Sequence, residues 1–109
     1  MPFYPASVET RIENRSEMEK IGPILARVID QIAAKQKELQ QTQQHADDLD
    51  KQADAARSAG DARKSLRLAQ DAIEVRNQAK AIKAEIRELE RKHENLLFKA
   101  RSGSGIEHR

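Results

Sequence analysis

Apolar and small residues recur along the chain with steps that alternate between four and three, first before Gly60 and again after it. Such an alternation places side chains on one stripe of a helix and is the a/d pattern of a coiled coil. The first ladder consists of Ile21, Leu25, Val28, Ile32, Lys35, Leu39, Thr42, Ala46, Leu49, Ala53 and Ala56. The second ladder consists of Ser65, Leu68, Ala72, Val75, Ala79, Ile82, Ile86, Leu89, His93, Leu96 and Ala100.

The two ladders fit one another if the chain reverses at Gly60. Facing positions then pair one to one, from Ala56 with Ser65 down to Ile21 with Ala100, and each pair joins an a position to a d position. The sequence therefore predicts an all-α fold, a long antiparallel two-helix coiled-coil hairpin. We expect such hairpins to assemble into a helical bundle, because many ladder positions are Ala and bury little apolar area.

The turn is marked by two adjacent residues within 58–61. Gly60 can adopt the left-handed conformation that ends a helix, and Asp61 is a good N-cap for the helix that follows. A connection this short favours antiparallel neighbours.

Three segments are expected along the chain. Residues 1–22 form an N-terminal arm or a short helix, because Pro2 and Pro5 favour an extended start. Residues 23–101 form the hairpin, since Pro23 is tolerated in a first helical turn and otherwise kinks a helix. Residues 102–109 begin with a Ser-Gly repeat and are expected to form a flexible tail.

Two ladder positions depart from the apolar rule. Lys35 faces Ile86, so its stem should pack while its ammonium reaches Glu38 or Glu85. His93 faces Val28 and is interpreted as a partly exposed, hydrogen-bonded histidine, a pH-sensitive layer or a ligand position. We predict that Lys35 and His93 help to set the register of the core, as single polar core residues do in coiled coils.

Several large apolar residues lie outside both ladders. A two-helix hairpin has no further layer to cover them, so we expect a partner helix, a second hairpin or the folded-back N-terminal arm to do so. The predicted partner-binding residues are Ile24, Ile29, Leu66, Ile73, Leu97 and Phe98.

Charge is divided unevenly between the predicted helices, although the net charge is only +2. Acidic residues gather near the turn on the first helix, at Asp47, Asp48, Asp50 and Asp54. Basic residues follow the second helix, at Arg76, Lys80, Lys83, Arg87, Arg91 and Lys92. Such charges commonly solvate the outer faces of helices, whereas a basic stripe can also contact the phosphates of nucleic acid.

The sequence offers little for catalysis. It has no Cys, no Gly-rich phosphate loop and no nucleophile motif. Glu90 and His93 have the Glu-x-x-His spacing of di-iron bundles, but the facing ladder positions are apolar. We expect a protein that is not an enzyme, without catalytic residues, cofactor, metal or small-molecule substrate.

No apolar run approaches the roughly 20 residues of a membrane helix, and the N-terminus lacks a signal peptide's basic and apolar regions. A cytoplasmic protein without a membrane span is the expectation. The outline is similar to WXG-type helical hairpins, prefoldin-like chaperone subunits and rod-shaped export chaperones. It lacks the Trp-x-Gly turn of the first and the inserted strands of the second, so no residue roles are carried over.

The composition and the ladders together favour a structural and interaction protein. The leading hypothesis is a coiled-coil hairpin that acts as a scaffold, chaperone or adaptor module through its exposed apolar residues. The alternative is a nucleic-acid-binding helical arm that uses the basic face of the second helix.

Overall fold

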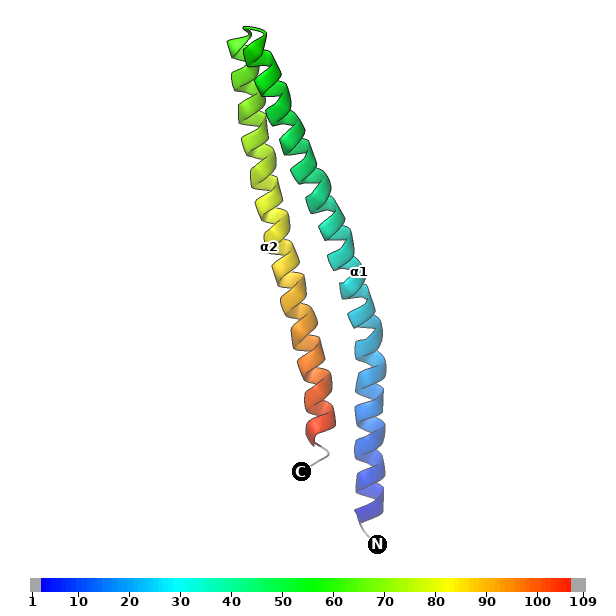
Figure 1. The fold of residues 1–109 in the computed structure, drawn as a ribbon. Helices are drawn as coiled ribbons and strands as arrows, with labels where there is room; N and C mark the ends of the chain where they lie inside the picture. The colour runs from blue at the N-terminus through cyan, green and yellow to red at the C-terminus, as the bar shows by residue number, and fades with distance from the viewer. Residues whose placement is uncertain (1–2, 107–109) are drawn as a thin grey trace. The chain divides into compact units, whose positions relative to one another are not determined.

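The computed structural model of the chain is an all-α hairpin of two long helices (Figure 1). It describes residues 3–106, and side chains over residues 19–101. Helix α1 spans Phe3–Ser58 and helix α2 spans Ala62–Ile106, and no strand occurs within residues 3–106. The predicted all-α helical hairpin is confirmed, and its assembly into a helical bundle stays a prediction.

The seam between the helices follows the two predicted ladders. Every ladder position from Ile21 to Ala100 is buried or half-buried. Elsewhere within residues 19–101, only four side chains are even half-buried: Asp50, Ala69, Asp71 and Leu97. The buried apolar residues are Ile21, Val28, Ala46, Leu49, Ala53, Ala56, Ala72, Val75, Ala79, Ile82 and Ile86.

The turn combines a helix C-cap with a helix N-cap. Gly60 has a φ of 82°, in the left-handed region that glycine adopts without a Cβ penalty. The amide of Gly60 donates to the carbonyl of Arg57 at 3.0 Å, and that of Asp61 donates to the carbonyl of Ala56 at 2.9 Å. These two bonds form a Schellman motif, which satisfies carbonyls at the end of α1.

Asp61 then starts the second helix. Its carboxylate accepts a hydrogen bond from the amide of Lys64 at 3.1 Å, as an N-cap side chain does. The hydroxyl of Ser65 donates to the carbonyl of Ala53 on α1 at 2.9 Å. One short segment therefore closes α1, opens α2 and ties the two together.

The helix ends differ from the expected ones. Helix α1 starts at Phe3 and continues through Pro23, so the predicted start of the long helix at Pro23 is wrong. Pro23 lacks the amide that would bond to the carbonyl of Glu19, but this loss is local, and the residues on either side keep the α-helical conformation. Helix α2 runs on to Ile106, past the expected end at Arg101.

The remaining terminal predictions are only partly covered. The extended start expected from Pro2 and Pro5 is contradicted from Phe3 onward, where the chain is helical. Residues 1–2 and 107–109 lie outside the described residues. The division of the chain at Pro23 into an arm and a hairpin therefore stays a prediction without a helix boundary to support it.

The contacts divide the hairpin into two compact units. The turn unit is Ala33–Arg87, and the terminal unit combines Met1–Ile32 with Glu88–Arg109. In the turn unit a core cluster of Ala46, Leu49, Ala72 and Val75 forms between the helices, with Leu68 packed against it. In the terminal unit, Ile21 and Val28 are the only buried side chains among the described residues.

Candidate interaction surfaces

The terminal unit exposes apolar side chains on both of its helices. On α1, Ile24 and Ile29 are exposed, and on α2 Phe98 is 72% exposed, while Leu97 is half-buried. Ile24 precedes the ladder residue Leu25, whereas Ile29 follows a ladder residue, so they project to opposite sides of the seam. Leu97 also follows a ladder residue, so Ile29 and Leu97 lie on the same side of the seam and Ile24 lies on the other. The apolar points of this unit therefore occupy both sides of the seam.

The turn unit exposes two large apolar residues on α2. Leu66 is 62% exposed and Ile73 is 58% exposed. They are seven residues apart, and Lys80 and Arg87 continue the same series. Residues spaced by seven lie on one line along a coiled-coil helix, so an apolar segment passes directly into a basic one.

A groove lies between α1 and α2 of the turn unit, at the level of Lys80 in this series. Its lining residues are Gln43, Ala46, Asp47, Arg76, Ala79, Lys80 and Lys83. Ala46 and Ala79, which are buried ladder residues, line it where the two helices meet. Among the described residues, no carboxylate lies within ion-pair distance of Lys80 or Lys83.

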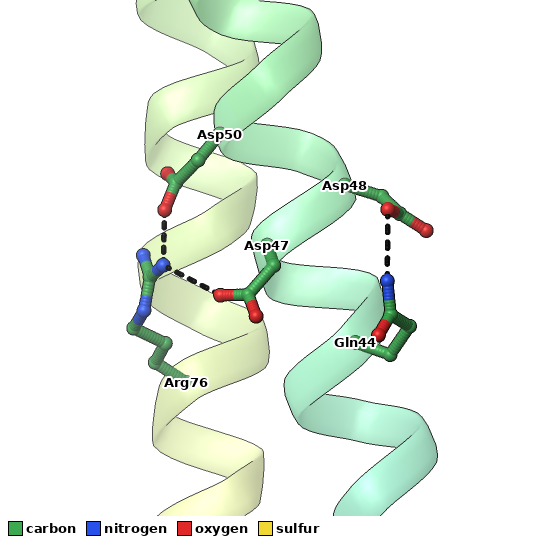
Figure 2. A network of polar contacts seen from close by, with 5 residues as sticks. All are labelled: Gln44, Asp47, Asp48, Asp50 and Arg76. Atoms are coloured by element: carbon green, nitrogen blue, oxygen red, sulfur yellow. Dashed lines mark hydrogen bonds and ion pairs between the residues drawn. The ribbon is translucent and has the colours of Figure 1, made fainter.

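One end of the groove is held by a cross-helix ion network (Figure 2). The guanidinium of Arg76 on α2 donates to the carboxylate of Asp50 on α1, and it lies 3.6 Å from the carboxylate of Asp47. The hydrogen bond from Arg76 lowers the pKa of Asp50, and the same bond raises the pKa of Arg76. Asp48, by contrast, accepts only from Gln44 of its own helix, at 3.2 Å.

Lys35 reaches both carboxylates that the sequence suggests. Its ammonium lies 2.6 Å from Glu85 on α2 and 3.3 Å from Glu38 on α1. The hydrogen bond with Glu85, and to a smaller extent that with Glu38, raises the pKa of Lys35 above 10.5. His93 is half-buried at its ladder position. The role of Lys35 and His93 in setting the register stays a prediction.

Comparisons with protein-family models, with curated proteins and with solved structures found no match to this chain. Among the described residues, no group of three or more His, Cys, Asp or Glu side chains gathers where a metal ion could be held. No helix in the described part of the chain is long and apolar enough to cross a membrane. The surfaces described above are therefore the features on which a function can be argued.

The groove and the Arg76 network are not predicted from the sequence. The acidic residues of α1 and the basic residues of α2 are predicted, but not which of them pair. Asp50 and Arg76 each follow a ladder residue, Leu49 and Val75, and such positions face one another across an antiparallel seam. That signal could have predicted the Asp50–Arg76 contact, whereas the groove depends on which side chains fill the space.

Proposed function

We propose that this hairpin is a non-catalytic interaction module, a scaffold or adaptor that binds other helices through its exposed apolar residues. The observation that carries the proposal is the exposure of large apolar side chains while the seam already uses every ladder position. The exposed residues are Ile24, Ile29, Leu66, Ile73 and Phe98, and the half-buried Leu97 is proposed to bind with them.

A two-helix hairpin has only one buried layer, the seam between its helices. A pair of helices buries one stripe on each, and a further apolar residue can be covered only by another element or another chain. Burial of apolar surface contributes about 25 cal/mol per Å², so several such residues together favour association. We also propose that copies of the chain associate with one another. A cytoplasmic location stays a prediction.

A nucleic-acid-binding arm is the second candidate, and the basic groove is the observation that favours it. Lys80 and Lys83 are available for phosphate contacts. One feature counts against it: no aromatic side chain lies on this surface to stack on bases.

The test compares charge placed on the apolar points with charge placed elsewhere in the same unit. Ile29→Glu with Phe98→Glu should reduce the mass measured by light scattering toward the 12.3 kDa of one chain. The matched control is Gln31→Glu with Asn95→Glu, which adds the same charge at exposed polar positions. It should keep the mass of the parent, and the parent's assembly should survive about 0.5 M salt because apolar burial drives it.

Two results would contradict the proposal. If the parent is monomeric and binds no helical partner, the exposed apolar residues have no binding role. If Lys83→Glu with Arg87→Glu abolishes a salt-sensitive complex with bulk RNA or DNA while the apolar variant behaves as the parent does, the nucleic-acid candidate replaces it.

A further inference from the structure

We infer that the α2 face of the turn unit is a docking site for an acidic amphipathic helix of a partner protein. The docking stripe consists of Leu66, Ile73, Lys80 and Lys83 on α2. Lys80 and Lys83 line the groove between α1 and α2, and the exposed Leu66 and Ile73 precede them toward the turn. This inference rests on the proposed function and specifies the chemistry of one partner.

Apolar and basic side chains follow one another along the docking stripe. Leu66 and Ile73 offer apolar contact at the end near the turn, and Lys80 and Lys83 offer two ammonium groups farther along α2. At 1.5 Å per residue the stripe is about 26 Å long. A helix of about 20 residues, with apolar residues at one end and carboxylates at the other, matches this length and order.

The cations at the groove differ in whether a carboxylate already pairs with them. Arg76, between the apolar and basic parts, is already bonded to Asp50 and close to Asp47. That network leaves Lys80 and Lys83 as the groove cations that no described carboxylate neutralises. Carboxylates on a partner helix would complement these two ammonium groups. A partner with basic residues at the same positions would be repelled by them.

The side chains at the centre of the groove are small. Ala46 and Ala79 line it where α1 and α2 meet, and Ala lets a partner helix approach the two helices closely there. A helix in this position would add a third member to the pair and cover Leu66 and Ile73. Recognition would then follow the helix-in-groove mode, in which anchors spaced by three, four and seven residues enter a groove.

A second copy of the chain fits this site poorly. If two turn units met face to face with their turns together, the apolar part of α2 would face the part of α1 that holds Asp50 and Asp54. If the turns pointed apart, the basic part of each α2 would face either the apolar or the basic part of the other. Neither arrangement pairs Lys80 and Lys83 with carboxylates.

The test uses a designed helical peptide of about 20 residues as the probe. It carries two Leu seven residues apart, followed by two Glu that continue the stripe at the spacing of Lys80 and Lys83. We expect fluorescence anisotropy to give a Kd in the micromolar range for the parent chain. Lys80→Glu with Lys83→Glu should weaken binding at least about tenfold, and Leu66→Ser with Ile73→Ser should do the same.

A matched control and a charge swap separate the docking stripe from general charge. Lys37→Glu with Lys51→Glu makes the same charge change at exposed positions of α1 in the same unit, and should leave the Kd within about twofold of the parent. A peptide with Lys in place of its two Glu should prefer the Lys80→Glu, Lys83→Glu variant. Circular dichroism on each variant checks that the helices are kept.

Three outcomes would overturn the inference. They are a Kd weaker than about 1 mM for the Leu/Glu peptide, equal weakening by the Lys37 and Lys51 control, or tighter binding of a duplex RNA or DNA that competes with the peptide. If the peptide fails while Ile29→Glu with Phe98→Glu still dissociates the parent, this inference is wrong and the interaction module stands. If both experiments fail, the proposed function itself is wrong.

Discussion

The turn unit and the terminal unit use the same heptad pattern but bury it to different degrees. The turn unit contains nine of the buried apolar residues, several of them Ala, together with every ion pair that joins α1 to α2 among the described residues. The terminal unit has larger ladder residues, yet Leu25, Ile32, Leu89 and Leu96 stay half-buried.

This difference shows that the size of a ladder residue does not set how well it is covered. Small side chains let two helices approach closely, and each is then buried completely, as Ala72 is at 0% exposure. Large side chains are also buried in the turn unit, as Ile82 and Ile86 are at 7% exposure, whereas the large ladder residues Leu25, Ile32, Leu89 and Leu96 of the terminal unit keep part of their surface accessible. The turn unit is therefore suited to holding the hairpin together, and the terminal unit retains apolar surface for contacts.

The largest expected effect comes from one disulfide in each unit. Leu39→Cys with Ile82→Cys in the turn unit, and Ile32→Cys with Leu89→Cys in the terminal unit, should each crosslink within one chain on mild oxidation. Closing a loop of about 40 residues or more should stabilise the fold by about 4 kcal/mol in the chain-entropy model. Non-reducing gels detect the crosslink within one chain, and melting curves measure the gain in stability.

The crosslinks also test the turn. Products linked only between chains would mean that the helices continue through Gly60 into a swapped rod, which its left-handed φ of 82° contradicts. A terminal-unit pair that fails to crosslink while the turn-unit pair succeeds would show that the helices of the terminal unit are not closely paired in solution.

The second prediction compares one substitution at a buried and a half-buried ladder position. Leu49→Ala in the turn unit should cost about 2 to 3 kcal/mol, because the removed atoms are buried and leave a cavity. Leu96→Ala in the terminal unit should cost about half as much, because Leu96 is only half-buried. Urea unfolding of both variants makes the comparison, and helix propensity cancels because the substitution is the same.

Equal costs at Leu49 and Leu96 would break the comparison between the units. Such a result would mean that Leu96 is covered in solution by something outside the hairpin, such as a second copy. Repeating the measurement at several protein concentrations identifies that case, because the stability of an assembly depends on concentration.

The seam could be read from the sequence because it depends on local spacing, and the turn because Gly60 and Asp61 have strong individual preferences. The helix ends could not be predicted, because the free-energy cost of Pro23 is offset by the long helical segments on either side of it. The preference of a single residue does not include that contribution. The Arg76 network also escaped prediction, since the ladder fixes which positions face one another but not which rotamers their side chains adopt. The occupant of an exposed apolar surface lies outside the chain, so it can only be proposed.

The third prediction concerns the charged position in the seam. Lys35→Leu should raise the melting temperature by a few degrees, because an apolar side chain can face Ile86 without carrying a charge to the surface. Lys37→Leu, on the exposed side of the same helix, is the control and should change the melting temperature little. Light scattering should accompany the melts, because removing a polar core residue can change the number of chains in an assembly.

The pH dependence shows whether the ion pairs of Lys35 matter. Its pKa is raised above 10.5 by Glu85 and Glu38, so their contribution is complete below pH 10.5 and is lost as the pH rises through the folded-state pKa. The parent should lose stability there, and Lys35→Leu should lose less. A lower melting temperature for Lys35→Leu at pH 7, with an unchanged mass, would mean that the bonds to Glu85 and Glu38 outweigh the apolar gain.

The smallest expected effect is at Asp50, on the cross-helix network of the turn unit. Arg76 lowers the pKa of Asp50 below 3.8, so the folded state binds a proton less readily than the unfolded state. The stabilisation is therefore present above about pH 4 and is lost as the pH falls through the lowered pKa. Asp50→Asn should flatten the stability curve in that acidic window and lower the melting temperature only slightly at pH 7, since the pair is exposed to solvent.

Asp48→Asn is the matched control, because Asp48 accepts only from Gln44 and faces no cation. If both variants change the acidic part of the curve equally, Arg76 holds Asp50 no more firmly than water does, and the turn unit depends on its Ala-rich seam alone for pairing its helices at this level.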